Sequence, residues 1–156
     1  MHSLNILKTA SKEERYQLLL PQIKALVAGE SDLIANMANV AAALKEVFGF
    51  WWVGFYLAKN NELVLGPFQG PVACTRIAYG KGVCGTAWAN GKVEIVPDVE
   101  LFPGHIACSA QSRSEIVIPF FGKEASGVLD IDSEHLNTFD NIDHCHLQTM
   151  LSYLDF

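Results

Sequence analysis

The sequence has few positive charges. Lys and Arg account for only 11 of its 156 residues, against 17 Asp and Glu, which gives a formal net charge of -6 and leaves no basic run. Nucleic acids and anionic membranes are bound by clustered positive charge. The composition therefore argues against both partners and favours a small cationic or zwitterionic ligand.

Long apolar runs are absent as well. No window approaches the roughly 18 to 20 apolar residues of a membrane span, and the N-terminus lacks the apolar stretch of a signal peptide. Neither a G-x-G-x-x-G pattern nor a P-loop is present, so no nicotinamide, flavin or other cofactor is expected. We expect a cytoplasmic protein with no membrane partner.

Cysteine is too scarce for a disulfide scaffold, because the chain has only four in an expected reducing compartment. No C-x2-C pair is present, so we expect no structural zinc or other metal site. The run from His144 to His146 does not change this, because adjacent helical residues point in different directions; Cys145 is predicted to be structural. The remaining thiols, at positions 74, 84 and 108, are either buried and inert or reactive.

Two of these cysteines lie in surroundings that suit reactivity. Cys84 lies where a helix is predicted to begin, and a helix N-terminus favours a thiolate. Cys108 lies in a loop near His105 and a polar run, and loops commonly carry nucleophiles. Three cysteines within the least regular part of the chain favour a reactive role over three inert ones.

The hydrophobic periodicity predicts one α+β domain over residues 1–156. Helices are predicted from a capping box at Ser11, with either a kink or two short helices at Pro21, from Leu33 to near Gly49, after Gly82, and from Asp140 toward Tyr153. The predicted strands are Trp51–Ala58, Leu63–Phe68, Val93–Val96, Ser114–Phe121 and Gly127–Asp132, and a loop is predicted over Pro97–Gln111. Tight turns between strands and helices at both ends of the chain indicate an antiparallel sheet with helices packed on it.

The first predicted strand is apolar on both faces. Alternation places Trp52, Gly54 and Tyr56 on one face, where the glycine would leave a hollow between two rings. Such a hollow could seat a ligand. Ordinary packing of aromatic side chains against a helix is the alternative interpretation.

Carboxylates gather on the last predicted strand and its neighbour. Asp130 and Asp132 share one face, and Glu115 opens the preceding strand across a predicted hairpin. They form either a polar solvent-facing surface or an acidic pocket, and an acidic pocket requires a cation. A substrate ammonium would suit it; a divalent metal is less well supported, because the ligand spacing of a calcium loop is absent.

Several separate motifs resemble one known family. They are Gly66-Pro-Phe-Gln-Gly70, Ala73-Cys74, Gly82-Val-Cys-Gly85, Gly104-His-Ile-Ala-Cys108, Ser114-Glu-Ile-Val117 and Gly127-Val-Leu-Asp-Ile-Asp132. Together they resemble the free methionine-(R)-sulfoxide reductases, a catalytic branch of the GAF domains. The resemblance covers nearly the whole chain. It implies a GAF-like α+β fold with a central antiparallel sheet of about six strands, a closed pocket for one amino acid, and a homodimer.

The resemblance also implies roles for particular residues. Cys108 would be the attacking thiol, Cys74 the resolving thiol and Cys84 an additional or alternative disulfide partner. Trp52 and Tyr56 would wall the pocket. The substrate contacts would be made by three carboxylates, Glu115, Asp130 and Asp132.

The reaction implied is reduction of free methionine sulfoxide through a Cys108 sulfenic acid and a Cys74–Cys108 disulfide, which a thioredoxin-type reductant reopens. Glu115 is the first choice of proton donor, because crowded carboxyls raise one another's pKa. A non-catalytic GAF module that binds a small ligand or senses redox state is the alternative function, and a purely structural protein would leave the clusters unexplained.

Overall fold

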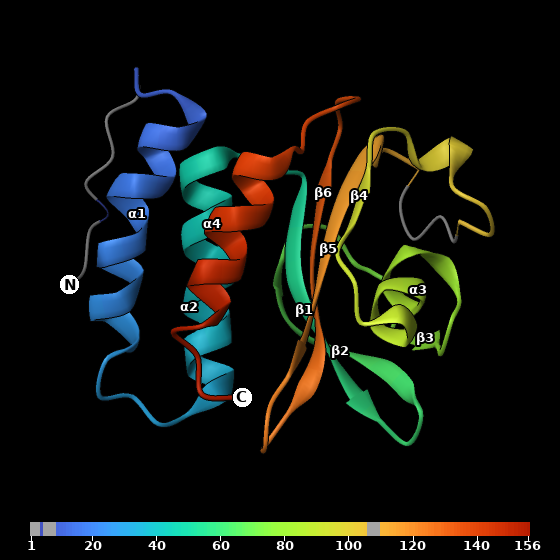
Figure 1. The fold of residues 1–156 in the computed structure, drawn as a ribbon, viewed down its shortest axis with the longest axis horizontal. Coiled ribbons are helices and arrows are strands. Elements are labelled where there is room, and N and C mark those ends of the chain that lie inside the picture. The colour runs from blue at the N-terminus through green and yellow to red at the C-terminus, as the bar shows by residue number, and fades with distance from the viewer. Residues whose placement is uncertain (1–3, 5–8, 106–109) are drawn as a thin grey trace.

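The computed structural model of the chain describes residues 4, 9–105 and 110–156. Figure 1 shows the order of its elements along the chain. They are α1 (Lys12–Val27), α2 (Leu33–Phe48), β1 (Trp52–Lys59), β2 (Glu62–Gln69), β3 (Arg76–Ala78), α3 (Gly82–Asn90), β4 (Glu94–Val96), the 3₁₀ helix η1 (Val99–Leu101), β5 (Ser114–Phe121), β6 (Ser126–Ser133) and α4 (Asn141–Leu151).

The strands form one six-stranded sheet in the order β3-β2-β1-β6-β5-β4, and all neighbours are antiparallel. The predicted fold class and number of strands are confirmed. Strand β3 was not predicted, because in its three residues only Ile77 is buried and two exposed residues flank it, which is too short for a period-two pattern.

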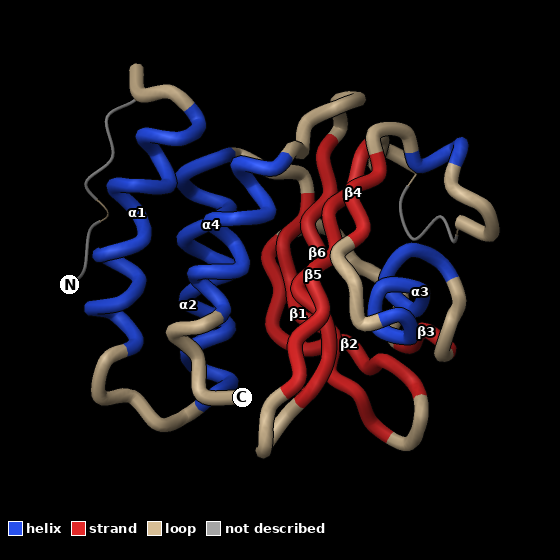
Figure 2. The backbone as a smooth tube through the Cα atoms, viewed as in Figure 1, coloured by secondary structure: helices blue, strands red, loops and turns tan. Residues whose placement is uncertain are grey.

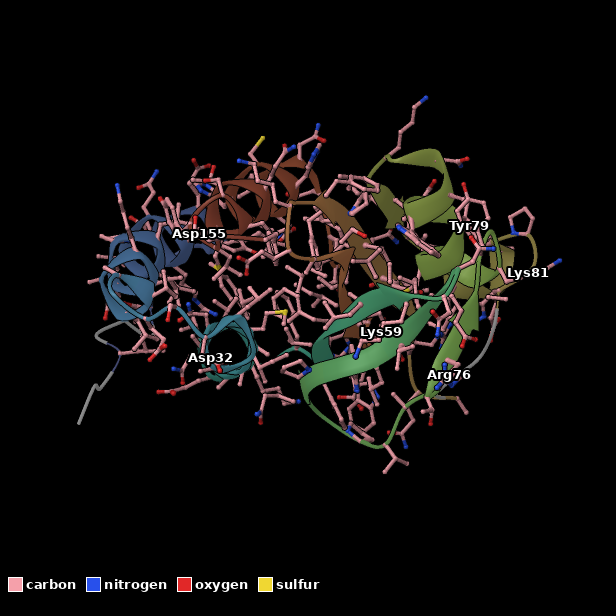
Figure 3. All side chains as sticks on the ribbon, turned by 90° about the horizontal axis from the view of Figure 1, so that it is seen from below. Asp32, Lys59, Arg76, Tyr79, Lys81 and Asp155 are labelled. Carbon is pink, nitrogen blue, oxygen red and sulfur yellow. The ribbon has the colours of Figure 1, made fainter. Side chains whose placement is uncertain are left out.

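The elements are stacked in layers, as Figures 1 and 2 show: α1 lies outermost, α2 and α4 cover one face of the sheet, and α3 lies on the other. The main core lies between the sheet and its two covering helices, where β1 contributes Val53 and Phe55 and β6 contributes Leu129 and Ile131. In the view of Figure 3, Asp32 and Asp155 lie on the helical side of the molecule, and Tyr79 and Lys81 lie on the opposite side.

Helix α1 begins with the predicted capping box, in which the Ser11 side chain accepts from the Glu14 backbone N–H and Glu14 accepts from that of Ser11. It continues through Pro21 as a single helix, so the alternative of two short helices is wrong. Pro21 and Gln17, whose carbonyl loses its helical partner, are both exposed. Solvent can therefore satisfy the carbonyl that the proline leaves unpaired.

Alternation along the strands decides what faces α3. Every second residue of β1, β5 and β6, such as Val53 and Leu129, points toward the core under α2 and α4. The residues between them therefore point to the other face of the sheet.

No helix of the described part of the chain has the length and apolar character needed to cross a bilayer. The cytoplasmic location stays a prediction.

Candidate active site

A pocket lies on the face of the sheet that carries α3, and several parts of the chain form its wall. Strands β1, β5 and β6 supply the floor. The sides come from the N-terminus of α3, the segment before β3 together with Ile77 of β3, and two residues between η1 and β5. The lining includes Trp52, Tyr56, Pro71, Val72, Ala73, Ile77, Val83, Cys84, His105, Ser112, Glu115, Asp130 and Asp132. Seven of the eight residues that the sequence singled out thus lie at or beside one site, since Cys74 directly follows Ala73.

Cys108, the eighth of these residues, lies outside the described residues, in the range 106–109. Its role as attacking thiol stays a prediction. Cys145 is a free, exposed thiol on α4, on the face of the sheet opposite the pocket, so it is not a core residue as a structural role would suggest.

The three carboxyl groups are brought together by strand register. On β6, Asp132 pairs with Trp52 of β1 on one side and with Glu115 of β5 on the other, and Asp130 pairs with Gly54. Side chains at such positions share a face and lie one strand spacing apart. Glu115 and Asp130 are each only 6% exposed, so the interpretation as a solvated polar surface is wrong.

Burial raises the pKa of each of these carboxyls. The pKa of Glu115 is raised by burial and then by repulsion from Asp130 and Asp132, and the pKa of Asp130 by burial and by Asp132. Burial raises the pKa of Asp132 to about 6, against the hydrogen bond that the Ser112 hydroxyl donates to it. The cluster is therefore partly protonated near neutral pH.

One carboxylate oxygen of the cluster is left unpaired. Asp130 Oδ1 is buried and has no hydrogen-bond partner among the described residues. No Lys or Arg is among the described residues that line the pocket. A buried carboxylate oxygen without a donor is costly, so the geometry fits a ligand that brings a positive charge or an N–H donor to this point.

Cys84 lies inside the same cluster, as the third residue of α3. Its Sγ is 3.8 Å from Glu115 Oε1, to which the thiol donates. Burial, followed by repulsion from Asp130 and Glu115, raises the pKa of the Cys84 thiol well above its ordinary value. The expectation that the helix N-terminus favours a thiolate here is wrong, because burial beside carboxylates outweighs a helix dipole worth up to about 2 kcal/mol.

Donor atoms of Cys84, Glu115 and Asp130 all lie within 4.8 Å of one another, close enough to share a cation. The set mixes one soft thiol with two hard carboxylates, a combination found in zinc sites. The expectation that the chain binds no metal stays a prediction.

The aromatic wall differs from the predicted one in one respect. Trp52 and Tyr56 line the pocket and stack on each other, with ring centroids 5.9 Å apart. The hollow expected above Gly54 is filled, because a Cβ there would lie 2.3 Å from Cη2 of Trp52 and 2.5 Å from Cβ of Phe68. Gly54 thus makes room for the indole, and the cavity lies beside the rings, toward the carboxyl groups.

Both aromatic side chains also hold a neighbouring segment of backbone. Trp52 Nε1 donates to the carbonyl oxygen of Pro71 at 3.1 Å, and Tyr56 Oη donates to that of Cys74 at 2.9 Å. The pocket wall and the segment that carries Cys74 are therefore connected through these two residues.

Ser112 was not predicted to belong to the site, although it is part of a polar run near Cys108. Its hydroxyl donates to Asp132, and it is 8% exposed. No local pattern places it there: Glu115 is the register partner of Asp132, and Ser112 reaches the same carboxylate from the segment before β5, where the Arg113 backbone N–H donates to the Ser133 carbonyl at 2.7 Å. His105 also lines the pocket, and burial lowers its pKa.

Comparison with known proteins identifies the family. The model of the GAF domain matches residues 32–154. The chain is 63% identical over 147 residues to GAF domain-containing protein A of Dictyostelium discoideum, with 93% of each chain covered. It is 46% identical over 147 residues to the free methionine-R-sulfoxide reductase of Escherichia coli K12, with 93% of this chain and 89% of that protein covered.

A solved structure shares both fold and sequence with the chain. The X-ray structure of free methionine-R-sulfoxide reductase from Neisseria meningitidis in complex with its substrate matches with a TM-score of 0.95 and 53% identity, covering 99% of this chain and 94% of that one. The sequence and structure comparisons agree over nearly the whole length of the chain, and the family model agrees with them over residues 32–154. The chain belongs to the GAF domain family and, within it, to the free methionine-R-sulfoxide reductases.

Proposed function

We propose that the chain is an oxidoreductase that reduces free L-methionine-(R)-sulfoxide to methionine. The observation that carries this proposal is the unpaired, buried Asp130 Oδ1 among three carboxyl groups, in a pocket whose described lining contains no Lys or Arg. A free amino acid brings the ammonium group that such a site lacks. The similarity to reductases of that name supports the same substrate.

The pocket offers a different surface to each end of this substrate. Asp130 and Asp132 receive the α-ammonium, and the rings of Trp52 and Tyr56 contact the apolar methyl and methylene groups. This arrangement directs the sulfoxide toward the side of the pocket where His105 and Ser112 lie. We assign the attack on it to Cys108, which follows that histidine in the chain.

In the first step the Cys108 sulfur takes the oxygen of the sulfoxide. Its thiolate bonds to the sulfur of the protonated sulfoxide, and this S–S bond and the S–O bond then both break as the OH group passes to the Cys108 sulfur. The sulfoxide sulfur is thereby reduced by two electrons and Cys108 is oxidised by two. The departing oxygen requires a proton. Glu115 supplies it, because burial and repulsion from its neighbours raise its pKa and so favour the protonated form.

In the second step Cys74 resolves the sulfenic acid. Its sulfur forms an S–S bond with Cys108, the S–O bond of the sulfenic acid breaks, and the hydroxyl leaves as water with the thiol proton of Cys74. A thioredoxin-type dithiol then reduces the disulfide by exchange. Cys84 is the secondary partner, because its raised pKa leaves less of the reactive thiolate.

We further propose that residues 1–156 act as a single catalytic domain, without a cofactor, in the cytoplasm and as a homodimer. Light scattering coupled to size-exclusion chromatography measures the oligomeric state, and a mass of about 17.1 kDa would contradict the dimer.

The deciding experiment is an assay of both epimers of free methionine sulfoxide with thioredoxin, its reductase and NADPH. We expect the R epimer to be consumed and the S epimer to be left. Binding of the sulfoxide without turnover of either epimer would contradict the proposal and favour the alternative, a non-catalytic ligand-binding or redox-sensing GAF module.

Two variants separate the cysteines. Cys108→Ser should abolish methionine formation even with a small dithiol as reductant, because the attacking sulfur is gone. Cys74→Ala should still form one methionine per enzyme but lose thioredoxin-coupled turnover. If Cys74→Ala formed no methionine in a single turnover, Cys74 would be the nucleophile.

A further inference from the structure

The irregular segment between β2 and β3, residues 70–75, is attached to β1 at two points. Trp52 holds it at Pro71 and Tyr56 holds it at Cys74, with side chain to carbonyl distances of 3.1 and 2.9 Å. The backbone N–H of Leu65 on β2 donates to the carbonyl of Thr75 at 3.0 Å, just beyond Cys74. These hydrogen bonds, to the carbonyl of Cys74 and to that of the next residue, tie the backbone on both sides of the Cys74 thiol to β1 and β2, while its sulfur is disulfide-bonded.

Apolar packing is uneven along this segment. Pro71 and Val72 are exposed, whereas Ala73 and Cys74 are partly buried and pack against the apolar cluster that contains Trp52 and Tyr56. A backbone with one exposed side relies on its hydrogen bonds as well as on this packing to keep one conformation. Loss of one of these hydrogen bonds should change how often Cys74 occupies its position without disturbing the sheet.

The Tyr56 hydroxyl donates to the Cys74 carbonyl from a side chain that is itself firmly held. Tyr56 is 1% exposed, and its strand pairs with β2 on one side and β6 on the other. Burial, with repulsion from Asp130, raises the pKa of Tyr56, so the hydroxyl stays protonated and able to donate throughout the working pH range.

We propose that the Tyr56 hydroxyl is a positioning group for the resolving thiol: its hydrogen bond to the Cys74 carbonyl holds Cys74 where the disulfide closes. The proposal rests on the proposed function, in which Cys74 resolves a sulfenic acid. It assigns Tyr56 two roles, because the ring walls the substrate pocket and the hydroxyl serves the step after methionine has formed.

Tyr56→Phe tests the proposal, because it keeps the ring and removes only the hydroxyl. Two rates are measured in a single turnover of the reduced enzyme: methionine formation by quenched-flow, and disulfide closure by loss of free thiols. One neutral hydrogen bond corresponds to roughly a three- to tenfold change, so the ratio of disulfide closure to methionine formation should fall by about that factor. The fraction of sulfenic acid trapped by dimedone should rise in parallel.

Tyr79→Phe is the matched control. Its hydroxyl also donates to a backbone carbonyl, that of Ala89 at 3.3 Å, but the residue is 49% exposed and does not line the pocket. It should leave the ratio unchanged. Combined with Cys74→Ala, Tyr56→Phe should no longer raise the trapped fraction, because the thiol that it positions is absent.

An unchanged ratio in Tyr56→Phe would overturn the proposal, and equal slowing of both steps would assign the hydroxyl to substrate binding or chemistry instead. A rise in trapped sulfenic acid that persisted without Cys74 would also contradict it. Failure of the proposed function is distinguishable, because the wild-type enzyme would then form no methionine from the free sulfoxide.

Discussion

At the scale of single residues, the site is a cluster of carboxyl groups whose negative charges repel one another. Glu115, Asp130 and Asp132 lie on adjacent strands with no described Lys or Arg among them, and the pKa of each is raised, chiefly by burial. Such an arrangement weakens the folded protein near neutral pH and becomes favourable when a cationic ligand enters. Natural sites commonly give up stability for function in this way.

Glu115→Gln tests the proton donor. The amide keeps the shape of the side chain but cannot supply the acidic proton, so methionine formation in a single turnover should slow by about 100-fold or more. In the wild-type enzyme the same rate should fall as pH rises through the raised pKa of Glu115, because the protonated form is the active one. Glu124→Gln, at an exposed turn position, is the control. A Glu115→Gln rate within threefold of wild type would exclude this carboxyl as the donor.

Asp132→Asn tests the electrostatic cost of the cluster. The pKa of Asp132 is about 6 in the folded chain and about 3.9 in an unfolded one. Its contribution to stability is therefore fully present below about pH 4 and is lost as pH rises to 6. Asn resembles the protonated form, so the variant should equal wild type in unfolding free energy near pH 4 and exceed it by about 3 kcal/mol at pH 7, because one pKa unit corresponds to about 1.4 kcal/mol.

Urea unfolding at both pH values measures this difference. Asp155→Asn, an exposed position on the helical side, is the control for a change of charge alone. A variant less stable than wild type at pH 7 would show that Asp132 is stabilised rather than strained by its surroundings.

At the scale of elements, a buried carboxylate binds the start of α1 to α4, in addition to the apolar residues by which α1 packs on the main core. Asp143 of α4 is fully buried, and it accepts from Tyr16 Oη at 2.8 Å and from Lys12 Nζ at 2.6 Å. Lys12 also donates to the Thr138 carbonyl at 2.8 Å and to Asp140 at 2.9 Å. These contacts fix the outermost helix to α4, on the side of the sheet away from the pocket.

Lys12→Met should therefore destabilise the fold without acting on the site. It leaves the buried Asp143 carboxylate without its cation, a loss that in fully buried pairs costs roughly 3 to 5 kcal/mol. The Lys12 side chain is 30% exposed, so we expect a smaller decrease in unfolding free energy, about 2 kcal/mol, by urea unfolding. Lys92→Met, at an exposed position, is the control. A change below 0.5 kcal/mol in Lys12→Met, on the order seen for ordinary surface positions, would mean that Tyr16 and the backbone N–H of Asp140 satisfy Asp143 without the lysine.

At the scale of the whole molecule, the pocket encloses its ligand with parts that are far apart in the sequence. Strands from the middle and the end of the chain supply its floor, and α3 and the segment before β3 supply its sides. A free amino acid fits such an enclosure better than a residue within a peptide. Acylation of the ammonium would also leave the carboxyl cluster without its partner.

The enzyme should consequently discriminate against acylated substrates. A buried charge without its partner costs roughly 3 to 5 kcal/mol, which corresponds to a few hundred-fold or more in kcat/KM. Specificity constants for free methionine-(R)-sulfoxide, its N-acetyl derivative and an oxidised peptide measure the effect. Comparable constants for all three would refute the ammonium pocket.

Local sequence patterns predicted most of the elements and which residues share a face, with the short strand β3 as an exception. The capping box at Ser11 and the period-two strands predicted the α+β fold, and alternation along β6 placed Asp130 and Asp132 on one face. These features depend on neighbours within a few residues, which is the range that periodicity and capping report. The resemblance added the roles of the cysteines, and that of Cys108 stays a prediction because the residue lies outside the described part of the chain.

The contacts that these faces make with other parts of the chain became known only from the tertiary structure. It filled the expected hollow over Gly54 with the Trp52 ring, and it placed the Cys84 thiol against Glu115, where burial raises rather than lowers its pKa. It also brought the Cys74 carbonyl to the Tyr56 hydroxyl. The Cys84–Glu115 and Tyr56–Cys74 contacts join residues far apart in the chain, and the Trp52 ring over Gly54 depends on a side-chain direction; local sequence patterns report neither.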